Sequence, residues 1–114
     1  MRSLVAVLVP VIAVVAAGCG PNCQSTCERL YFEDAANCGV PTPGRDTDEA
    51  FRDCINACEE ALDAPGELGT YNPDDRQTSG ESIILQNETQ AAAWMECVDQ
   101  TSCEDINAGY CEPH

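Results

Sequence analysis

Apolar positions recur at helical spacing in three stretches of the chain, after an opening run that stays apolar from residue 4 to residue 15. Side chains three or four positions apart share one face of a helix, so each stretch predicts a helix with one buried face. The first predicted helix covers residues 23–37, with a stripe of Cys23, Cys27, Leu30 and Tyr31. The second starts at residue 46 or 47, with a stripe of Phe51, Cys54, Ile55, Cys58 and Leu62. The third covers residues 81–99, with a stripe of Ile84, Glu88, Ala91, Met95 and Val98.

Polar residues are expected to set the ends of these helices. Either Asn22, or Ser25 together with Glu28, can cap the first helix. Pro65 ends the second, and residues 67–80 then form a long polar loop. The third helix is expected to be capped by Thr78 against Glu81, and a short helical turn over residues 102–108 by Ser102. The whole pattern is helical.

The N-terminal segment is organised like an export signal. Arg2 supplies a positive charge, the apolar run follows, and small residues precede Cys19. The run is shorter than the roughly 20 residues that a membrane-spanning helix needs, which makes an uncleaved anchor the weaker interpretation. Cleavage by an ordinary signal peptidase, which would give a freely secreted chain, stays open as the main alternative.

The sequence Ala16-Ala17-Gly18-Cys19 resembles the lipobox of bacterial lipoproteins. That resemblance implies cleavage before Cys19, a diacylglyceryl group on its sulfur and an acyl chain such as palmitate on its new amino group. Residues 1–18 are then a signal peptide, residues 19–22 a lipidated tether and residues 23–114 a Cys-rich helical domain. Several lipid chains hold a protein firmly to a membrane. We therefore expect an exported protein anchored at the cell envelope, in the outer membrane if the host is Gram-negative.

The cysteine count agrees with this interpretation. The chain has nine Cys, and removing Cys19 as the lipid acceptor leaves eight, enough for four disulfides. Such a density in a short exported chain is typical of a disulfide scaffold. The eight are Cys23, Cys27, Cys38, Cys54, Cys58, Cys97, Cys103 and Cys111.

Two Cys-x3-Cys pairs predict how the first two helices are joined. Residues four apart on a helix have Cβ atoms about 5–6 Å apart, further than a disulfide allows, so each pair should reach a neighbouring helix. In an antiparallel hairpin the bonds would be Cys23–Cys58 and Cys27–Cys54, whereas Cys23–Cys54 would indicate parallel packing. The pairing of the other four is left open, although a bond from Cys38 to the C-terminal group would link the third helix to the hairpin.

The fold class that follows is all-α: a small disulfide-stapled bundle made of an antiparallel helical hairpin, a third helix and a short C-terminal helix. The core is expected to be thin, because a chain of this size buries little apolar surface. Its predicted members are Leu30, Phe32, Phe51, Ile55, Leu62, Ile83, Ile84, Trp94 and Met95.

Two further resemblances concern the cysteines. The twin Cys-x3-Cys pairs resemble those of α-hairpinin peptides and of small chaperones of the mitochondrial intermembrane space, which implies hairpin geometry and no activity. The whole chain resembles the Cys-rich lipoproteins of myxobacteria in its lipobox Cys19, its helix-borne Cys, its Ala-rich acidic helices and its ending from Cys103 to Cys111. That resemblance implies no particular chemistry.

Charge limits the range of partners. The formal net charge of the chain is −15, and removal of Arg2 with the signal peptide makes it −16. Nucleic-acid binding needs cationic contacts to phosphate, and attraction to anionic lipid head groups needs cations too, so neither is expected. Membrane attachment must come from the N-terminal lipid. A protein partner with a basic surface fits this charge.

Few residues offer catalytic chemistry. The chain has no Lys and a single His at position 114, so the usual general bases are missing. The cysteine spacing fits neither a zinc site nor a redox Cys-x-x-Cys pair, and we expect no metal and no cofactor. We therefore expect a non-enzymatic binding or structural module of the envelope, with binding residues on the loop at 67–80 and on the acidic helix faces. An inhibitor or interaction domain for a basic protein is the alternative, and a redox or metal-binding protein is a weaker third.

Overall fold

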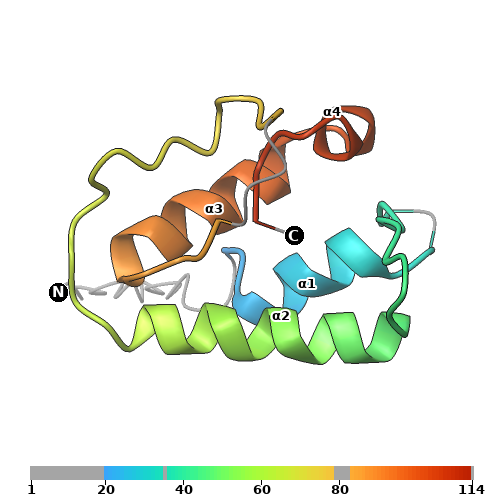
Figure 1. The fold of residues 1–114 in the computed structure, drawn as a ribbon, viewed down its shortest axis with the longest axis horizontal. Coiled ribbons are helices and arrows are strands. Elements are labelled where there is room, and N and C mark those ends of the chain that lie inside the picture. Colours follow the sequence, from blue (N-terminus) through green and yellow to red (C-terminus); the bar gives the residue numbers. More distant parts are fainter. Residues whose placement is uncertain (1–19, 35, 79–82, 114) are drawn as a thin grey trace, which may run out of the picture.

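The computed structural model describes residues 20–34, 36–78 and 83–113 of the chain. Within these residues it has helices and no strand: α1 (Cys23–Tyr31), α2 (Thr47–Leu62), α3 (Glu88–Gln100) and α4 (Cys103–Asn107). The first three helices contact one another, and α4 lies beyond the end of α3 (Figure 1). The protein is thus the small disulfide-stapled helical domain that the sequence predicts. None of the described helices is long and apolar enough to cross a membrane.

Four disulfides join the described segments. Cys23 is bonded to Cys58 and Cys27 to Cys54, with Cα atoms 5.7 and 6.0 Å apart. These are the bonds expected for an antiparallel pair, since the first cysteine of α1 meets the last of α2. Of the pairings left open, the structure contains Cys38–Cys103 and Cys97–Cys111. The former links the α1–α2 connection to α4, and the latter closes the C-terminal residues onto α3.

The start of α1 uses Asn22 as its cap. Asn22 Oδ1 accepts a hydrogen bond from the Ser25 backbone N–H at 2.8 Å, and Ser25 Oγ accepts from the Asn22 N–H at 3.0 Å. This reciprocal pair is a capping box, which satisfies two backbone N–H groups that have no partner within the helix. Of the two caps that the sequence allows, the earlier one is therefore formed.

The end of α1 is earlier than predicted, at Tyr31 instead of residue 37. The chain turns back over the helix, and the backbone N–H groups of Cys38 and Val40 donate to the carbonyls of Arg29 and Leu30. The Arg29 side chain stabilises this turn and the end of α3 together. Its guanidinium donates to the carbonyl oxygens of Ala36, Val98 and Thr101 at 2.8, 2.8 and 2.6 Å. Two of these carbonyls belong to the C-terminal end of α3, where helix carbonyls lack partners of their own.

The other helices agree with the pattern to different degrees. α2 occupies the predicted stretch, and its first turn carries Asp48 and Glu49 near the positive end of the helix dipole. α4 lies within the predicted turn, and Ser102 Oγ accepts from the Asp105 N–H as its cap. The start of α3 at Glu88 instead of residue 81 is a correction. The proposed cap of Thr78 against Glu81 involves a residue outside the described ranges.

The late start of α3 follows from Asn87. Its Oδ1 accepts from the backbone N–H groups of Thr89 and Gln90, both at 3.0 Å, and its Nδ2 donates to the Glu67 carbonyl at 2.9 Å. Gly66 permits this contact, because a Cβ there would lie 2.7 Å from the Asn87 side chain. Asparagine caps a helix well because its short side chain replaces the missing carbonyl of the preceding turn. Helix therefore begins after residue 87.

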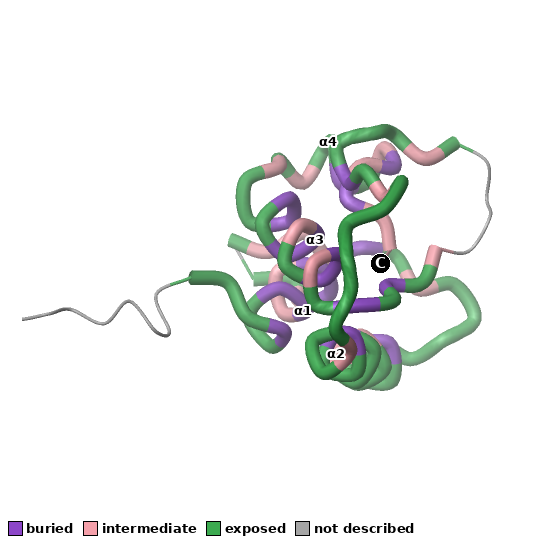
Figure 2. Tube along the Cα trace, turned by 90° about the vertical axis from the view of Figure 1, so that its left-hand side faces the viewer, coloured by how far each residue is buried: buried purple, intermediate pink, exposed green. Residues whose placement is uncertain are grey.

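The core lies where the buried faces of α1, α2 and α3 meet (Figure 2). Leu30, Trp94 and Met95 are buried as predicted, whereas Ile84 is 74% exposed and Leu62 is 38% exposed. Of the sixteen buried apolar residues in the described ranges, five are half-cystines, so sulfur fills much of the interior. Ala91 and Val98, on the predicted stripe of the third helix, are buried too, and the buried apolar residues outside the predicted core and stripes, half-cystines aside, are Val40, Ala50, Ala61, Leu85 and Ile106.

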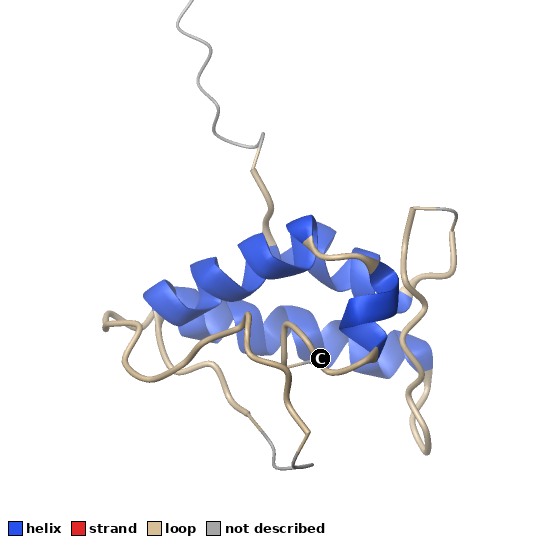
Figure 3. Cartoon of the chain, turned by 90° about the horizontal axis from the view of Figure 1, so that it is seen from above, coloured by secondary structure: helices blue, strands red, loops and turns tan. Residues whose placement is uncertain are grey.

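Seen from above, the connection between α2 and α3 lies on the same side of the helices as the C-terminal segment (Figure 3). Backbone hydrogen bonds join the two: Gln77 N–H donates to the Gly109 carbonyl at 2.9 Å, and Cys111 N–H donates to the Pro73 carbonyl at 3.0 Å. The connection is thus a second layer over the helices.

We predict that complete reduction of the four disulfides unfolds the protein. Each bond is worth about 2–4 kcal/mol, which together exceeds what so small a core supplies. Far-ultraviolet circular dichroism before and after reduction measures the loss of helix. Native helicity in the fully reduced and alkylated chain would contradict the expectation.

We predict that Arg29→Met lowers the free energy of unfolding by about 2 kcal/mol, because it removes charge-assisted hydrogen bonds to partly buried carbonyls. In a domain of this size that corresponds to a melting temperature lower by roughly 10 °C. Arg52→Met is the matched control, since Arg52 is exposed on α2 and the charge change is the same. Equal thermal melts of the two variants would show that the Arg29 contacts contribute nothing.

Candidate functional site

Hydrogen bonds fix the loop that is predicted to carry binding residues, over its described residues 67–78. Besides the two backbone hydrogen bonds to the C-terminal segment, Arg76 Nε donates to the Ala108 carbonyl at 2.7 Å. Gly109 is required at this junction, because its φ is +114° and a Cβ would lie 2.5 Å from the Gln77 carbonyl oxygen. Residues 67–78 therefore present their side chains from a fixed backbone, which is the arrangement that favours specific binding.

Tyr71 anchors this loop at its middle. Its hydroxyl donates to the backbone carbonyl of Glu112, and the residue is half-buried. Burial raises the pKa of Tyr71 above its ordinary value, and the negative charges of Glu112 and Asp74 raise it further. Burial likewise raises the pKa of Tyr31, although the nearby Arg45 opposes the shift. Both phenols are therefore neutral hydrogen-bonding groups over the whole physiological pH range.

A short apolar segment leads from the loop into α3 and lies between two hollows. We call residues 83–85 the ridge; they are Ile83, Ile84 and Leu85. The ridge is neither helix nor turn, and it forms a straight stretch before α3 in Figure 1. Ile84 is 74% exposed while Leu85 is 9% exposed.

The first hollow, which we call the polar hollow, has a volume of about 520 Å³ and lies between loop residues 70–77 and the ridge. Its lining includes the carboxylates of Asp75 and Glu112, the Tyr71 ring and the amides of Gln86 and Gln90. Gln90 is fixed, because its Oε1 accepts from the Gln86 N–H at 2.9 Å and its Nε2 donates to the Leu68 carbonyl at 3.2 Å.

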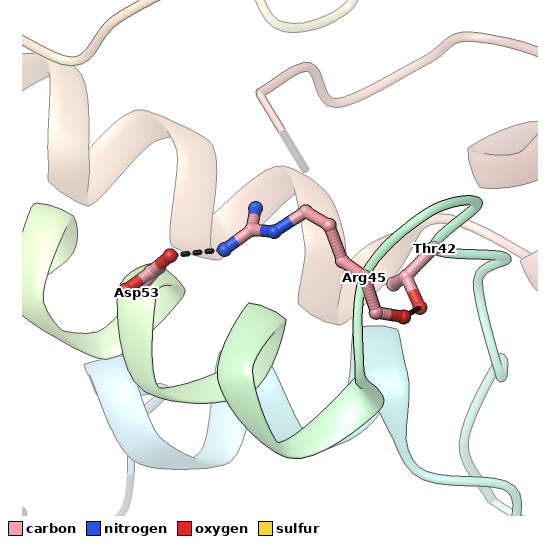
Figure 4. Close-up of polar contacts among 3 residues, drawn as sticks. All are labelled: Thr42, Arg45 and Asp53. Carbon is pink, nitrogen blue, oxygen red and sulfur yellow. Dashed lines mark hydrogen bonds and ion pairs between the residues drawn. The ribbon is translucent and has the colours of Figure 1, made fainter.

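The second hollow, which we call the apolar hollow, has a volume of about 210 Å³ and lies between α2 and the ridge. Ala50, Ala57, Trp94 and the half-cystines Cys54 and Cys58 form much of its lining. Arg45 and Asp53 also line it, and the two side chains form an ion pair that reaches from the turn before α2 to the helix itself (Figure 4). Both charges are exposed.

The predicted site residues are placed as follows. Cys19, the expected lipid acceptor, lies outside the described residues. The eight cysteines at positions 23–111 are all in disulfides, so none of them presents a thiolate for redox or nucleophilic chemistry. Over residues 20–34, 36–78 and 83–113, no three His, Cys, Asp or Glu side chains gather in a way that could hold a metal ion. The acidic residues of α2 are exposed, as expected, at Asp48, Glu49, Asp53, Glu59 and Glu60.

Comparisons with models of protein families, with curated proteins and with solved structures find no match to this chain. Local geometry is therefore the basis for assigning a role to the hollows. The ridge between them was missed by the sequence pattern, which places residues 83–85 in a helix. Two adjacent β-branched residues followed by Asn87, a strong helix-starting residue, are the signal that could have located it.

We predict that Tyr71→Phe lowers stability at neutral pH by about 1 kcal/mol, the net worth of one hydrogen bond. It should also flatten the loss of stability at alkaline pH. In the folded protein the raised pKa keeps the proton on Tyr71, while the unfolded chain loses it above about pH 10, so folding weakens as pH rises beyond that value.

Urea unfolding of the wild type and of Tyr71→Phe between about pH 8 and pH 11 measures this difference. The two stability curves should converge as the pH rises. Curves that stay parallel over the whole range would show that the Tyr71 phenol is not the titrating group.

Proposed function

We propose that this protein is a non-catalytic lipoprotein of the cell envelope that acts as a small binding module. The observation that carries the proposal is the fixed layer formed by the α2–α3 connection and the C-terminal segment, which borders two hollows on a disulfide-stapled scaffold. Cavities of this kind with fixed walls suit recognition. Disulfides suit a small domain that works outside the cytoplasm.

The anchor is the lipid expected on Cys19. Its support is the lipobox-like Ala16-Ala17-Gly18-Cys19 together with the cysteine count, since the remaining eight cysteines are all consumed in four disulfides. Helix α1 begins at Cys23, so the tether of residues 19–22 spans at most about 14 Å. The domain would therefore be held close to the membrane surface, with the lipid as its only attachment.

A second candidate is an inhibitor or interaction domain that occupies a basic protein. The formal net charge of −15 favours it, because an acidic surface attracts and orients a basic partner. Redox or metal chemistry is the least supported candidate. Redox chemistry or a cysteine-ligated metal would need thiolates, and the described cysteines are in disulfides.

We predict that the intact mass of the natively purified protein is that of a lipidated chain beginning at Cys19. Alkylation should add nothing before reduction and eight alkyl groups after it, one for each cysteine from Cys23 to Cys111. A Cys19→Ala variant is the matched control, and it should lose both the lipid mass and the membrane association. A wild-type mass without lipid would favour the freely secreted alternative, and alkylation before reduction would favour a reactive-thiol protein.

A further inference from the structure

The ridge has backbone groups with no partner in the described structure. No hydrogen bond from any described residue reaches the N–H or C=O groups of Ile83, Ile84 and Leu85. The next backbone N–H, that of Gln86, is already satisfied by Gln90. Unpaired donors and acceptors in consecutive residues are the property by which a strand edge recruits another chain.

The ridge also has the side-chain alternation of a strand. Ile84 is exposed, Leu85 is buried, Gln86 is exposed and Asn87 is buried. Successive side chains of an extended chain point to opposite sides, and this alternation is the pattern expected of such a chain. The buried Leu85 and the Asn87 cap fix the inner side, which leaves the outer edge in a constant position.

The two hollows border the ridge. Ile83 and Ile84 line both the polar hollow and the apolar hollow, so the ridge separates the two. A peptide that paired with the ridge would direct successive side chains to the two opposite faces of the paired strands. The apolar hollow, floored by Ala50, Ala57 and Trp94, suits a small aliphatic side chain.

Charge selects the occupant. Two acidic residues, Asp75 and Glu112, line the polar hollow with a single cation, Arg76, so negative residues outnumber positive ones there. In the apolar hollow the cation Arg45 is paired with Asp53. With a formal net charge of −15, the chain repels a second copy of itself and attracts a basic segment. Lysine or arginine side chains directed to the polar hollow would complete the match.

We propose that residues 83–85 form the docking edge for an extended basic segment of a partner protein, which adds to the ridge as a strand. Neighbouring residues of an extended chain face opposite edges, so the affinity comes from main-chain hydrogen bonds to one alternate set, either Ile83 with Leu85 or Ile84. An aliphatic side chain in the apolar hollow and a basic one in the polar hollow provide the selectivity. The proposal rests on the binding role proposed above, of which it names the partner chemistry, and it is independent of the lipid anchor.

The test uses a short, end-blocked peptide that alternates lysine and valine, added to the oxidised, natively purified protein in neutral detergent. Binding is followed by the fluorescence of Trp94, the single tryptophan and 2% exposed, and by the NMR shifts of backbone amides. We expect saturable binding that weakens with added salt, with the largest amide shifts at residues 83–85. A peptide alternating glutamate and valine should not bind.

Three variants separate main-chain pairing from nonspecific hydrophobic contact with the exposed side chain. Neighbouring residues of an extended chain present their N–H groups to opposite edges, so Ile83→Pro and Ile84→Pro each remove the donor of one edge. The substitution on the partner's edge should raise the dissociation constant about tenfold or more, the loss expected for one or two hydrogen bonds, and the other should leave it nearly unchanged. Ile84→Thr keeps the donor and the β-branch, and it should bind within about threefold of wild type. Thermal melts check that all three variants are folded. N-methylation of alternate peptide nitrogens should abolish binding.

Four results would overturn the proposal, the last of them a dimer. The first is no binding of the lysine–valine peptide, and the second is binding that maps to the acidic face of α2 with residues 83–85 unmoved. The third is an affinity that neither N-methylation of the peptide nor either proline substitution changes, which would indicate nonspecific charge attraction. A concentration-dependent dimer that masks residues 83–85 would likewise replace the peptide by a second copy. Each of these leaves the intact-mass result on the lipid anchor unaffected.

Discussion

The two disulfides between α1 and α2 are the constraint on which the rest of the structure depends. α1 has only nine residues, and helices this short are marginal in water without tertiary support. Bonds from Cys23 to Cys58 and from Cys27 to Cys54 hold it antiparallel to α2 at two points one turn apart. In that position Arg29 reaches the end of α3, and Leu30 enters the core. The sulfurs are also core atoms, so the cross-link and the packing are one feature.

Sequence reasoning succeeded where the deciding interaction is local or geometric. The span of α2, the cap of α4 by Ser102 and the choice of cysteine partners for α1 and α2 all depend on residues a few positions apart or on the fixed reach of a disulfide. It failed where a distant residue decides. α1 stops at Tyr31 because the chain there turns back under Arg29, and two of the three carbonyls that Arg29 binds lie about seventy positions ahead. No pattern within the first helix contains that information.

The start of α3 combines a local and a distant contact. Helical periodicity continues backwards from Ala91 to Ile84, yet the helix begins after Asn87, which caps Thr89 and Gln90 and also bonds to Glu67 across the α2–α3 connection. Periodicity alone places residues 83–85 on a helix face and Ile84 in a core that it does not enter. The sequence also predicts a long polar loop between the second and third helices. The attachment of this loop through Pro73, Gln77 and Tyr71 depends on the C-terminal residues. The candidate site is thus made by long-range contacts, which explains why the sequence pattern indicated its neighbourhood and missed its central ridge.

The placement of the arginines has a consequence for proteolysis. A trypsin-like protease cleaves after lysine or arginine. The chain has no lysine, so only its arginines offer cleavage sites. Arg29 and Arg52 lie within helices joined by disulfides, while Arg45 and Arg76, in non-helical segments, have side chains held by Asp53 and by the Ala108 carbonyl. Proteolytic cleavage requires several residues to unfold locally into an extended form. The cation-poor composition that gives this protein its charge therefore also makes it a poor substrate for digestive proteases with that specificity.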